Sequence, residues 1–325
     1  MKKKITILFP CIGRRVVLLK CFRQAARKIG LQCNIIGTDS SSISPALLCS
    51  DIQRVVLPID HPHYMRETLR IIRQYKVDLV VPTLDLDLSK WASWRNRLAK
   101  EGCTVLISSA QAVETCQDKR KMYRFLKENG FDTPETLTVT EAMKKKWHRF
   151  PYFLKPWDGY ASKGNAVITN KEELKFFGRR IPNCLVQEYI DGQEYTIDVF
   201  VDFEGQVRCL VPRKRIEARS GEVSKAQTVR HQGIMDISKN LIDTLQAGPG
   251  VITLQCFLGK NDNIKIIEVN PRFGGGVPLS IKAGADFPYW IMKQWVGQTP
   301  RYGNNRWREG LLMTRYDEAV WVSPT

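Results

Sequence analysis

The residues best suited to chemistry lie on one short apolar segment, KIIEVNPRFGGG (265–276). An acid, an amide and a guanidinium stand on alternate residues of this segment, as Glu268, Asn270 and Arg272. Alternate residues of a β-strand point to the same side of a sheet, and glycines let backbone approach a ligand closely. The segment therefore predicts either a ligand site at the end of a strand or a polar sheet edge.

The preceding strand, VITLQCFL (251–258), adds another polar side chain. If Asn261 and Asp262 form a two-residue hairpin turn, 257 pairs with 266 and Gln255 pairs with Glu268. Directly paired residues of a hairpin share a face. We therefore expect Gln255 to lie beside Glu268.

The expected strand faces decide what these side chains can bind. Alternation puts Ile264, Ile266, Glu268 and Asn270 on one face. Together with Gln255, this face offers carboxylate and amide oxygens, which suit Mg²⁺ because that cation takes oxygen ligands and keeps waters and phosphates as the others. A polar edge hairpin without any ligand accounts for the same segment equally well.

A second group of residues lies in FLKPWDGYASKGN (153–165). Lys155 ends an apolar strand, and the loop that follows contains Gly159, Ser162 and Gly164. A glycine-rich hairpin lets backbone N–H groups approach a phosphate, while a lysine at the strand end supplies charge. Such hairpins also occur without a ligand, so this segment alone does not decide between the two.

A third group lies in LVQEYIDGQEYTIDVFVD (185–202), where two apolar strands flank a short linker. The linker backbone can read the edge of an adenine, and Glu194 just beyond it can accept from ribose hydroxyl groups. Taken singly, acids such as Glu188 and Glu194 are more often ordinary surface acids than ligands of a nucleotide.

Strands and helices alternate over about the first 110 residues, which predicts a small parallel sheet covered by helices. Ligands of such sheets bind at the carboxyl ends of the strands, here near Gly13, Asp39 and Asp85. Arg14 and Arg15 lie at the same edge and suit an anionic substrate, although they could equally be plain surface arginines. The first turn contains no GxGxxG, so no dinucleotide fingerprint is present.

A single helical stretch is expected over 111–130, with Lys119 near its middle and Gly130 at its end. Beyond it, runs of period two separated by glycine-containing turns predict a largely antiparallel α+β region. Helices are expected near 171–178 and 235–247.

Composition bounds the class of protein. Of the 325 residues, 43% are apolar and 26% charged, as in ordinary globular proteins, and no apolar run reaches the roughly 20 residues of a membrane helix. Nine cysteines without a CxxC pair indicate reduced thiols and a cytoplasmic location. The net charge of +17 is spread over short basic clusters (144–149, 213–219) without a nucleic-acid recognition motif, which disfavours a nucleic-acid partner.

Taken together, these segments resemble the ATP-grasp superfamily, and the chain is similar to the carbamoyl-phosphate synthetase large chain in the single-module form of many carboxylate–amine ligases. The resemblance covers nearly the whole chain and is most specific over 251–288. It implies a Rossmann-like pre-ATP-grasp domain (1–112) followed by a small lobe (113–187) and a large lobe (188–325) of a two-lobed ATP-grasp fold, thus α/β plus α+β.

The resemblance also assigns roles to residues. The following would hold ATP: Lys119 and Lys155 at the α/β-phosphates, Glu188, Tyr189 and Ile190 as the adenine hinge, and Glu194 at the ribose. Gln255, Glu268 and Asn270 would serve Mg²⁺, with Mn²⁺ as an alternative ion, and Arg272 would contact the γ-phosphate and an acyl phosphate. Secondary candidates in the segment that closes over the phosphates are Arg215, Arg219 and Lys225.

The expected function is an ATP- and Mg²⁺-dependent ligase that joins a small-molecule carboxylate to an amine or similar nucleophile. The sequence contains one grasp module rather than a tandem, so carbamoyl phosphate synthesis is not expected. The alternatives are an ATP-dependent small-molecule kinase on the same fold and a non-catalytic nucleotide-binding protein. Expected partners are the small-molecule substrates, with no membrane and with a homodimer as one option.

Overall fold

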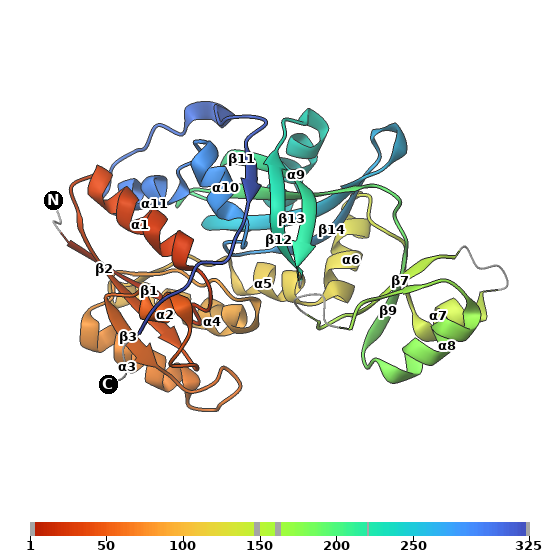
Figure 1. Ribbon diagram of the computed structural model, residues 1–325, viewed down its shortest axis with the longest axis horizontal. Coiled ribbons are helices and arrows are strands. Elements are labelled where there is room, and N and C mark those ends of the chain that lie inside the picture. The colour runs from red at the N-terminus through yellow and green to blue at the C-terminus, as the bar shows by residue number, and fades with distance from the viewer. Residues whose placement is uncertain (1–3, 146–149, 160–163, 220, 323–325) are drawn as a thin grey trace.

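The computed structural model describes residues 4–145, 150–159, 164–219 and 221–322 (Figure 1). Its N-terminal part is a five-stranded sheet in the order β3-β2-β1-β4-β5, in which all neighbours are parallel, as the alternation of strands and helices predicted. The strands are β1 (Lys4–Phe9), β2 (Gln32–Asp39), β3 (Ile52–Val55), β4 (Leu79–Val80) and β5 (Thr104–Val105). The helices are α1 (Val16–Lys28), α2 (Pro45–Leu48), α3 (Tyr64–Tyr75) and α4 (Leu88–Lys100), with a 3₁₀ turn, η1, at Asp85–Asp87.

The helical stretch expected over 111–130 is two helices, α5 (Ala110–Gln117) and α6 (Lys119–Glu128). The expectation of one helix was wrong because Asp118 adopts an extended conformation (φ −108°, ψ 109°) and its carboxylate accepts from the backbone N–H of Arg120. An aspartate in this role is an N-cap, which starts a new helix. Lys119 is consequently the first residue of α6 rather than the middle of a longer helix.

The small lobe is a four-stranded antiparallel sheet in the order β6-β9-β7-β8. Its elements are β6 (Thr136–Thr138), α7 (Val139–Lys144), β7 (Tyr152–Pro156), β8 (Ala166–Ile168), α8 (Lys171–Arg180) and β9 (Cys184–Glu188). Leu154, Leu174 and Val186 belong to a hydrophobic core that is separate from the main one. In Figure 1 this lobe stands apart from the rest of the molecule, with α7 and α8 beside its sheet.

The large lobe is a six-stranded antiparallel sheet in the order β14-β13-β10-β11-β12-β15. Its strands are β10 (Gln193–Val201), β11 (Val207–Arg219), β12 (Glu222–Thr228), β13 (Gly250–Leu258), β14 (Ile264–Asn270) and β15 (Leu312–Thr314). Its helices are α9 (Gln232–Leu245), α10 (Val277–Ala283) and α11 (Phe287–Trp295), with 3₁₀ turns η2 (Lys260–Asp262) and η3 (Gly303–Asn305).

The N-terminal part and the large lobe share one core. Phe22 of α1 packs edge-on against both Phe9 of β1 and Phe273, with ring centroids 5.1 Å and 5.8 Å apart. Buried residues from both parts belong to the same hydrophobic cluster. Because burial of this apolar surface stabilises the contact, the carboxyl edge of the parallel sheet is fixed beside the loop after β14.

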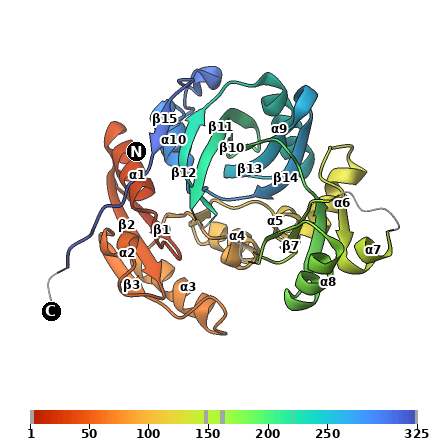
Figure 2. The same ribbon diagram turned by 45° about the vertical axis from the view of Figure 1, so that its right-hand side comes forward.

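The C-terminal segment that follows β15 returns to the N-terminal part. Figures 1 and 2 both show it crossing that part of the molecule beyond the six-stranded sheet. Lys20 of α1 and Glu318 form an ion pair there at 3.7 Å. The segment therefore brings residues from the far end of the chain next to the first turn.

The β13–β14 hairpin pairs Gln255 with Glu268, as predicted, but by a different route. The turn contains the three residues of η2 instead of two, with Asn261 and Asp262 at positive φ, so Phe257 pairs with Lys265 and not with Ile266. A β-bulge then leaves Ile267 unpaired and restores the expected partner of Glu268.

The bulge changes which side chains share a face. Glu268 and Asn270 lie on the same face as Lys265, whereas Ile266 and Val269 are buried on the other face. The expectation that Ile264 and Ile266 share the face of Glu268 was therefore wrong, because an extra residue between 266 and 268 reverses the alternation.

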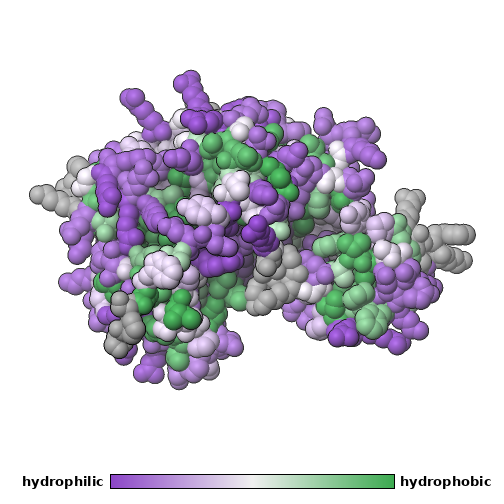
Figure 3. All heavy atoms as spheres, in the orientation of Figure 1, coloured by the Kyte–Doolittle hydropathy of each residue, from purple (hydrophilic) through white to green (hydrophobic). Residues whose placement is uncertain are grey.

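Hydrophilic side chains cover most of the face shown in Figure 3, in keeping with the net charge of +17. All nine cysteines are free thiols. Within the described ranges, no helix is long and apolar enough to cross a membrane.

Candidate functional site

Two lysines mark one end of the candidate site. Lys155, on β7, is only 4% exposed, and burial lowers the pKa of its ammonium to about 8, with Lys119 acting in the same direction and Glu268 against it. Lys119 donates to the carbonyl oxygen of Gly159, 2.6 Å away, which ties α6 to the glycine loop. In the described ranges, no carboxylate lies within ion-pair distance of Lys155. A buried cation without a carboxylate partner is suited to an anionic ligand.

The loop between these lysines and β8 is only partly described. Residues 160–163, including Ser162 of the predicted phosphate loop, lie outside the described ranges, as do 146–149 of the basic cluster. Gly164, where the description resumes, has φ +77° and packs against Pro156. A residue with a Cβ is disfavoured in this conformation, so the glycine is required by the turn itself.

Glu268 is the central residue of a second group of polar side chains, which lies on the β13–β14 face of the large lobe. Gln255 Nε2 and Asn270 Nδ2 donate to the same carboxylate oxygen of Glu268, at 2.6 Å and 2.9 Å. Thr196 of β10 pairs with Gln255 in the sheet, and its hydroxyl is buried with no hydrogen-bond partner among the described residues. The three predicted metal-site residues are thus adjacent on one sheet face.

This donor set fits magnesium. It comprises one carboxylate and two amide oxygens, and Mg²⁺ is held by few protein oxygens when phosphates and water complete its coordination. The described residues contain no group of three or more His, Cys, Asp or Glu side chains that could hold a metal without such help. Gln255, Glu268 and Asn270 therefore suit a metal that arrives with a nucleotide.

The linker between β9 and β10 is fixed by a lysine that the sequence pattern did not single out. Lys265 donates to Glu188 Oε2 at 2.6 Å, and the backbone N–H of Glu135 donates to the same oxygen at 3.2 Å. Burial opposes ionisation of Glu188, but the hydrogen bond from Lys265, the backbone N–H of Glu135 and the charge of Lys265 together outweigh it and lower the pKa of this carboxyl. Lys265 could not be found from alternation, because the bulge that puts it on this face is not visible in the sequence.

Beyond Glu188, the expected adenine hinge is open to solvent. Tyr189 is 44% exposed, and Ile190 is partly buried. Glu194, at the start of β10, forms an ion pair with Arg215 at 3.1 Å, and burial raises the pKa of its carboxyl. The negative charge of Glu268 acts on Glu194 in the same direction, so the two acids are near neighbours.

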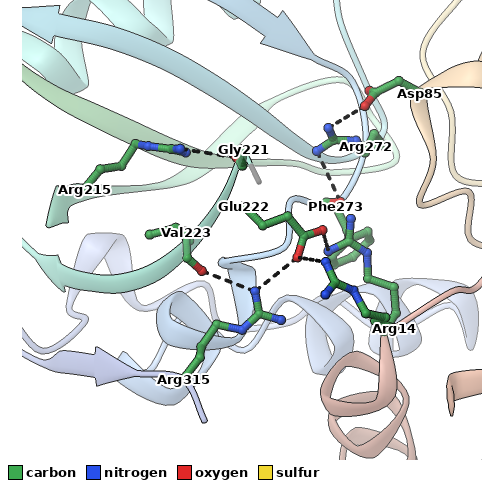
Figure 4. A network of polar contacts seen from close by, with 10 residues as sticks. Arg14, Asp85, Arg215, Gly221, Glu222, Val223, Arg272, Phe273 and Arg315 are labelled. Carbon is green, nitrogen blue, oxygen red and sulfur yellow. Dashed lines mark hydrogen bonds and ion pairs between the residues drawn. The ribbon is translucent and has the colours of Figure 1, made fainter. Parts of the chain in front are cut away.

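Arg272 connects the two parts of the molecule. It follows β14 with a side chain that is 14% exposed, and its Nη2 donates to Asp85 Oδ2 of η1 at 2.6 Å (Figure 4). Burial acts against the charged form, but Asp85 and Glu268 outweigh it and raise the pKa of Arg272. Its Nε is buried without a hydrogen-bond partner in the described structure. The guanidinium thus keeps a free donor beside the Glu268 face.

A second set of arginines surrounds Glu222 at the start of β12. Arg14, Arg15 and Arg315 approach its carboxylate at 3.6, 3.3 and 3.2 Å. We call Arg14, Arg15, Glu222 and Arg315 the Glu222 cluster; Figure 4 shows Arg14 and Arg315 on either side of Glu222. One acid and three arginines from separate parts of the sequence therefore meet where β12, the first turn and the C-terminal segment come together.

The three glycines after Arg272 are explained by packing. A Cβ on Gly274 would lie 2.7 Å from the Thr253 hydroxyl, and one on Gly276 would lie 2.2 Å from Arg213 Nη1. Such distances are shorter than van der Waals contact. Arg15 Nη1 would lie 2.7 Å from a Cβ on Gly275, so the glycine run lets three side chains approach this backbone. The sequence interpretation, centred on backbone N–H donors, did not include this role.

Not every predicted residue joins the site. Arg219 is exposed and pairs with Glu217 at 3.2 Å, and Lys225 pairs with the same acid at 2.7 Å. A cavity of about 540 Å³ opens elsewhere, between Arg95 of α4 and the end of α9, and contains none of the predicted residues.

Two family descriptions match the chain. An ATP-grasp domain matches residues 116–276, and the N-terminal domain of PylC-like proteins matches residues 7–106. These matches agree with the two-lobed antiparallel part and the parallel sheet described above.

Solved structures with the same fold include several ligases and carboxylases. The biotin carboxylase domain of 2-oxoglutarate carboxylase from Hydrogenobacter thermophilus, in complex with MgADP, ADP and bicarbonate, has 17% identity and a TM-score of 0.75 over 96% of this chain and 73% of its own. N5-carboxyaminoimidazole synthetase from Staphylococcus aureus, complexed with ADP, has 19% identity and a TM-score of 0.73 over 93% of this chain and 79% of its own. L-amino acid ligase from Bacillus licheniformis has 18% identity and a TM-score of 0.71 over 91% of this chain and 75% of its own. At these identities the likeness establishes the fold.

Proposed function

We propose that this chain, an ATP-grasp protein with a PylC-like N-terminal domain, is an ATP- and Mg²⁺-dependent ligase that activates a small-molecule carboxylate and joins it to an amine or similar nucleophile. The observation that carries the proposal is the meeting of Lys155, Glu268 and Arg272. Lys155 is buried and the side chain of Arg272 is 14% exposed, and the charge of Glu268 favours the protonated form of both, which supports assigning the three residues to one site.

ATP would bind between the lobes. Lys119 and Lys155 would hold the α/β-phosphates, and the segment from Glu188 to Ile190 would lie along the adenine, with Lys265 keeping Glu188 in place. Glu194 would accept from the ribose. The buried ammonium of Lys155 offsets phosphate charge more strongly than an exposed lysine would, because screening by water is reduced.

The carboxylate oxygen of the substrate would attack the γ-phosphorus in line, the bond to the bridging oxygen would break, and ADP would leave. The nucleophile would then attack the acyl carbon and expel phosphate, losing its proton to solvent. Arg272, with its free Nε, is placed to stabilise negative charge on the transferring phosphoryl group. Magnesium held by Gln255, Glu268 and Asn270 would supply further charge neutralisation.

Further proposals follow from this assignment. We divide the chain into a Rossmann-like domain (1–112), a small lobe (113–187) and a large lobe (188–325). The substrates are small molecules and the protein is cytoplasmic with reduced thiols. A homodimer is proposed because the related biotin carboxylase domain was solved as a dimer; light scattering of the purified protein would test this.

The decisive experiment is a screen for ADP formation. Purified protein is incubated with Mg·ATP and panels of small carboxylates and amino acids, each with and without amines. A ligase releases ADP and phosphate with a carboxylate and forms an amide-like product when an amine is added. ADP release with a stable phosphorylated acid would indicate a kinase instead. Calorimetric absence of Mg·ATP binding would refute the assignment altogether.

A further inference from the structure

The Glu222 cluster contains more positive charge than its acid neutralises. Three guanidinium groups face one carboxylate, which leaves two net positive charges. Of these three arginines, only Arg315 makes a hydrogen bond to Glu222 in the described structure, at 3.2 Å, whereas Arg14 and Arg15 are ion-paired with it. The side chain of Arg15 is only 18% exposed, whereas that of Arg14 is 73% exposed.

Arg15 is an unfavourably placed cation in the absence of a ligand. Burial lowers the pKa of its guanidinium; Glu222 counteracts this, while Arg272 and Arg315 add to it. In the described structure, Glu222 is the only carboxylate within ion-pair distance of Arg15. An additional anion at this point would relieve both the desolvation and the repulsion between cations.

The cluster borders the proposed reaction centre without being part of the phosphate subsite. A Cβ on Gly275 would lie 2.7 Å from Arg15 Nη1 and 3.3 Å from the carboxylate of Glu222, so the cluster lies against the glycine run that follows Arg272. The charges that act most strongly on Arg15 are those of Glu222, Arg272, Arg315 and Asp85.

Arg315 reaches the cluster by sheet pairing. Its backbone N–H donates to the carbonyl oxygen of Ser224 at 2.9 Å, which continues the β12–β15 pairing and carries the side chain to Glu222. The ATP-grasp match ends at residue 276, so Arg315 lies outside both family descriptions.

We propose that the Glu222 cluster binds a carboxylate group of the ligase substrate, with Arg15 and Arg315 as its two anchors and Glu222 as the residue that positions them. This inference rests on the proposed function and narrows the substrate to an anionic small molecule. Guanidinium groups bind carboxylates through paired N–H donors, and two arginines from separate elements fix both position and orientation. Arg14, at the exposed rim, attracts the anion without fixing it.

The test measures binding of one defined probe, malonate, by calorimetry in the presence of saturating Mg·ADP. Arg315→Gln and Arg15→Lys are compared with Arg70→Gln, in which an exposed arginine on α3 is changed. The expected result is a malonate Kd at least about tenfold higher in the two cluster variants and unchanged in the control, with Mg·ADP affinity retained. Arg15→Lys keeps the positive charge, so a loss of malonate affinity in this variant would report on the paired N–H donors and not on charge alone.

A variant that is expected to strengthen malonate binding separates a binding role of the cluster from a structural one. Glu222→Gln keeps a side-chain oxygen that can accept from Arg315 and so preserves the positioning, but it removes the competing negative charge, and malonate affinity is expected to rise severalfold. If Glu222→Gln and Arg315→Gln weaken malonate binding equally, the cluster is a structural contact and the proposal is overturned. Unchanged binding in Arg15→Lys and Arg315→Gln, or no binding of malonate to the wild-type protein, overturns it as well. Failure of Mg·ADP to bind wild type would instead refute the proposed function.

Discussion

The most informative perturbation is Lys155→Met, which removes a buried charge while keeping most of the side-chain volume. Lys155 is a cost to the ligand-free protein, because burial moves the pKa of its ammonium from 10.5 to about 8. At 1.36 kcal/mol for each pKa unit, this corresponds to on the order of 3 kcal/mol. The cost is repaid only when phosphates arrive, so the same residue should destabilise the free protein and stabilise the complex.

The sign of the pH dependence follows from the lowered pKa. Between about pH 8 and 10.5 the unfolded chain holds a proton on this lysine that the native protein has lost. Stability therefore rises with pH in this window, and the cost is fully present below pH 8. Lys155→Met should be more stable than wild type at pH 7, and its stability should rise less between about pH 8 and 10.5. Urea unfolding at pH 7 and at the upper end of this window would measure both effects.

Nucleotide binding should show the reverse effect. Phosphates raise the pKa of Lys155, so wild type should take up about half a proton on binding Mg·ATP at pH 8, where half of these lysines are neutral. Calorimetry in buffers of different ionisation enthalpy measures this uptake. Lys155→Met should lose it and bind Mg·ATP at least about tenfold more weakly, a loss near 1.4 kcal/mol.

The matched control is Lys175→Met, on the exposed side of α8. It changes net charge by the same amount in the same lobe and should bind Mg·ATP normally. Unchanged affinity and unchanged proton uptake in a folded Lys155→Met protein would refute the assignment of Lys155 to the phosphate site.

The other predictions concern the metal set and the hinge. Glu268→Gln should lower kcat at least about a hundredfold, near 2.7 kcal/mol, with nucleotide affinity better preserved; near-normal ADP formation with an identified substrate would exclude the metal role. Asn270→Ala should act in the same way but more mildly, as the ratio of the two kcat values would show. Lys265→Met should raise the Kd for Mg·ATP about two- to fivefold by releasing Glu188, since a partly exposed ion pair contributes up to about 1 kcal/mol. An unchanged calorimetric Kd for Mg·ATP in Lys265→Met would mean that nucleotide binding does not depend on the ion pair between Lys265 and Glu188.

Local sequence patterns determined the larger elements. The alternation of strands and helices in the N-terminal part could be predicted from hydrophobic periodicity and capping signals, such as Gly30, which has positive φ just beyond α1. The parallel sheet followed from this alternation. The strand ends carrying Lys155 and Glu268 were also visible in the sequence. Even the pairing of Gln255 with Glu268 was predicted correctly, although a turn one residue longer and a bulge at Ile267 offset each other to produce it.

Tertiary structure decided which side chains from distant parts of the sequence meet. The bulge at Ile267 exchanged Ile266 for Lys265 on the site face, because a single unpaired residue reverses alternation and depends on how β14 fits against β13 and α6. Arg315 and Glu222 are 93 residues apart, and Arg272 and Asp85 are 187 apart. No periodic signal links such positions. They come together because burial of the shared core fixes the parallel sheet, the large lobe and the C-terminal segment against one another, and only that packing sets which charges become neighbours.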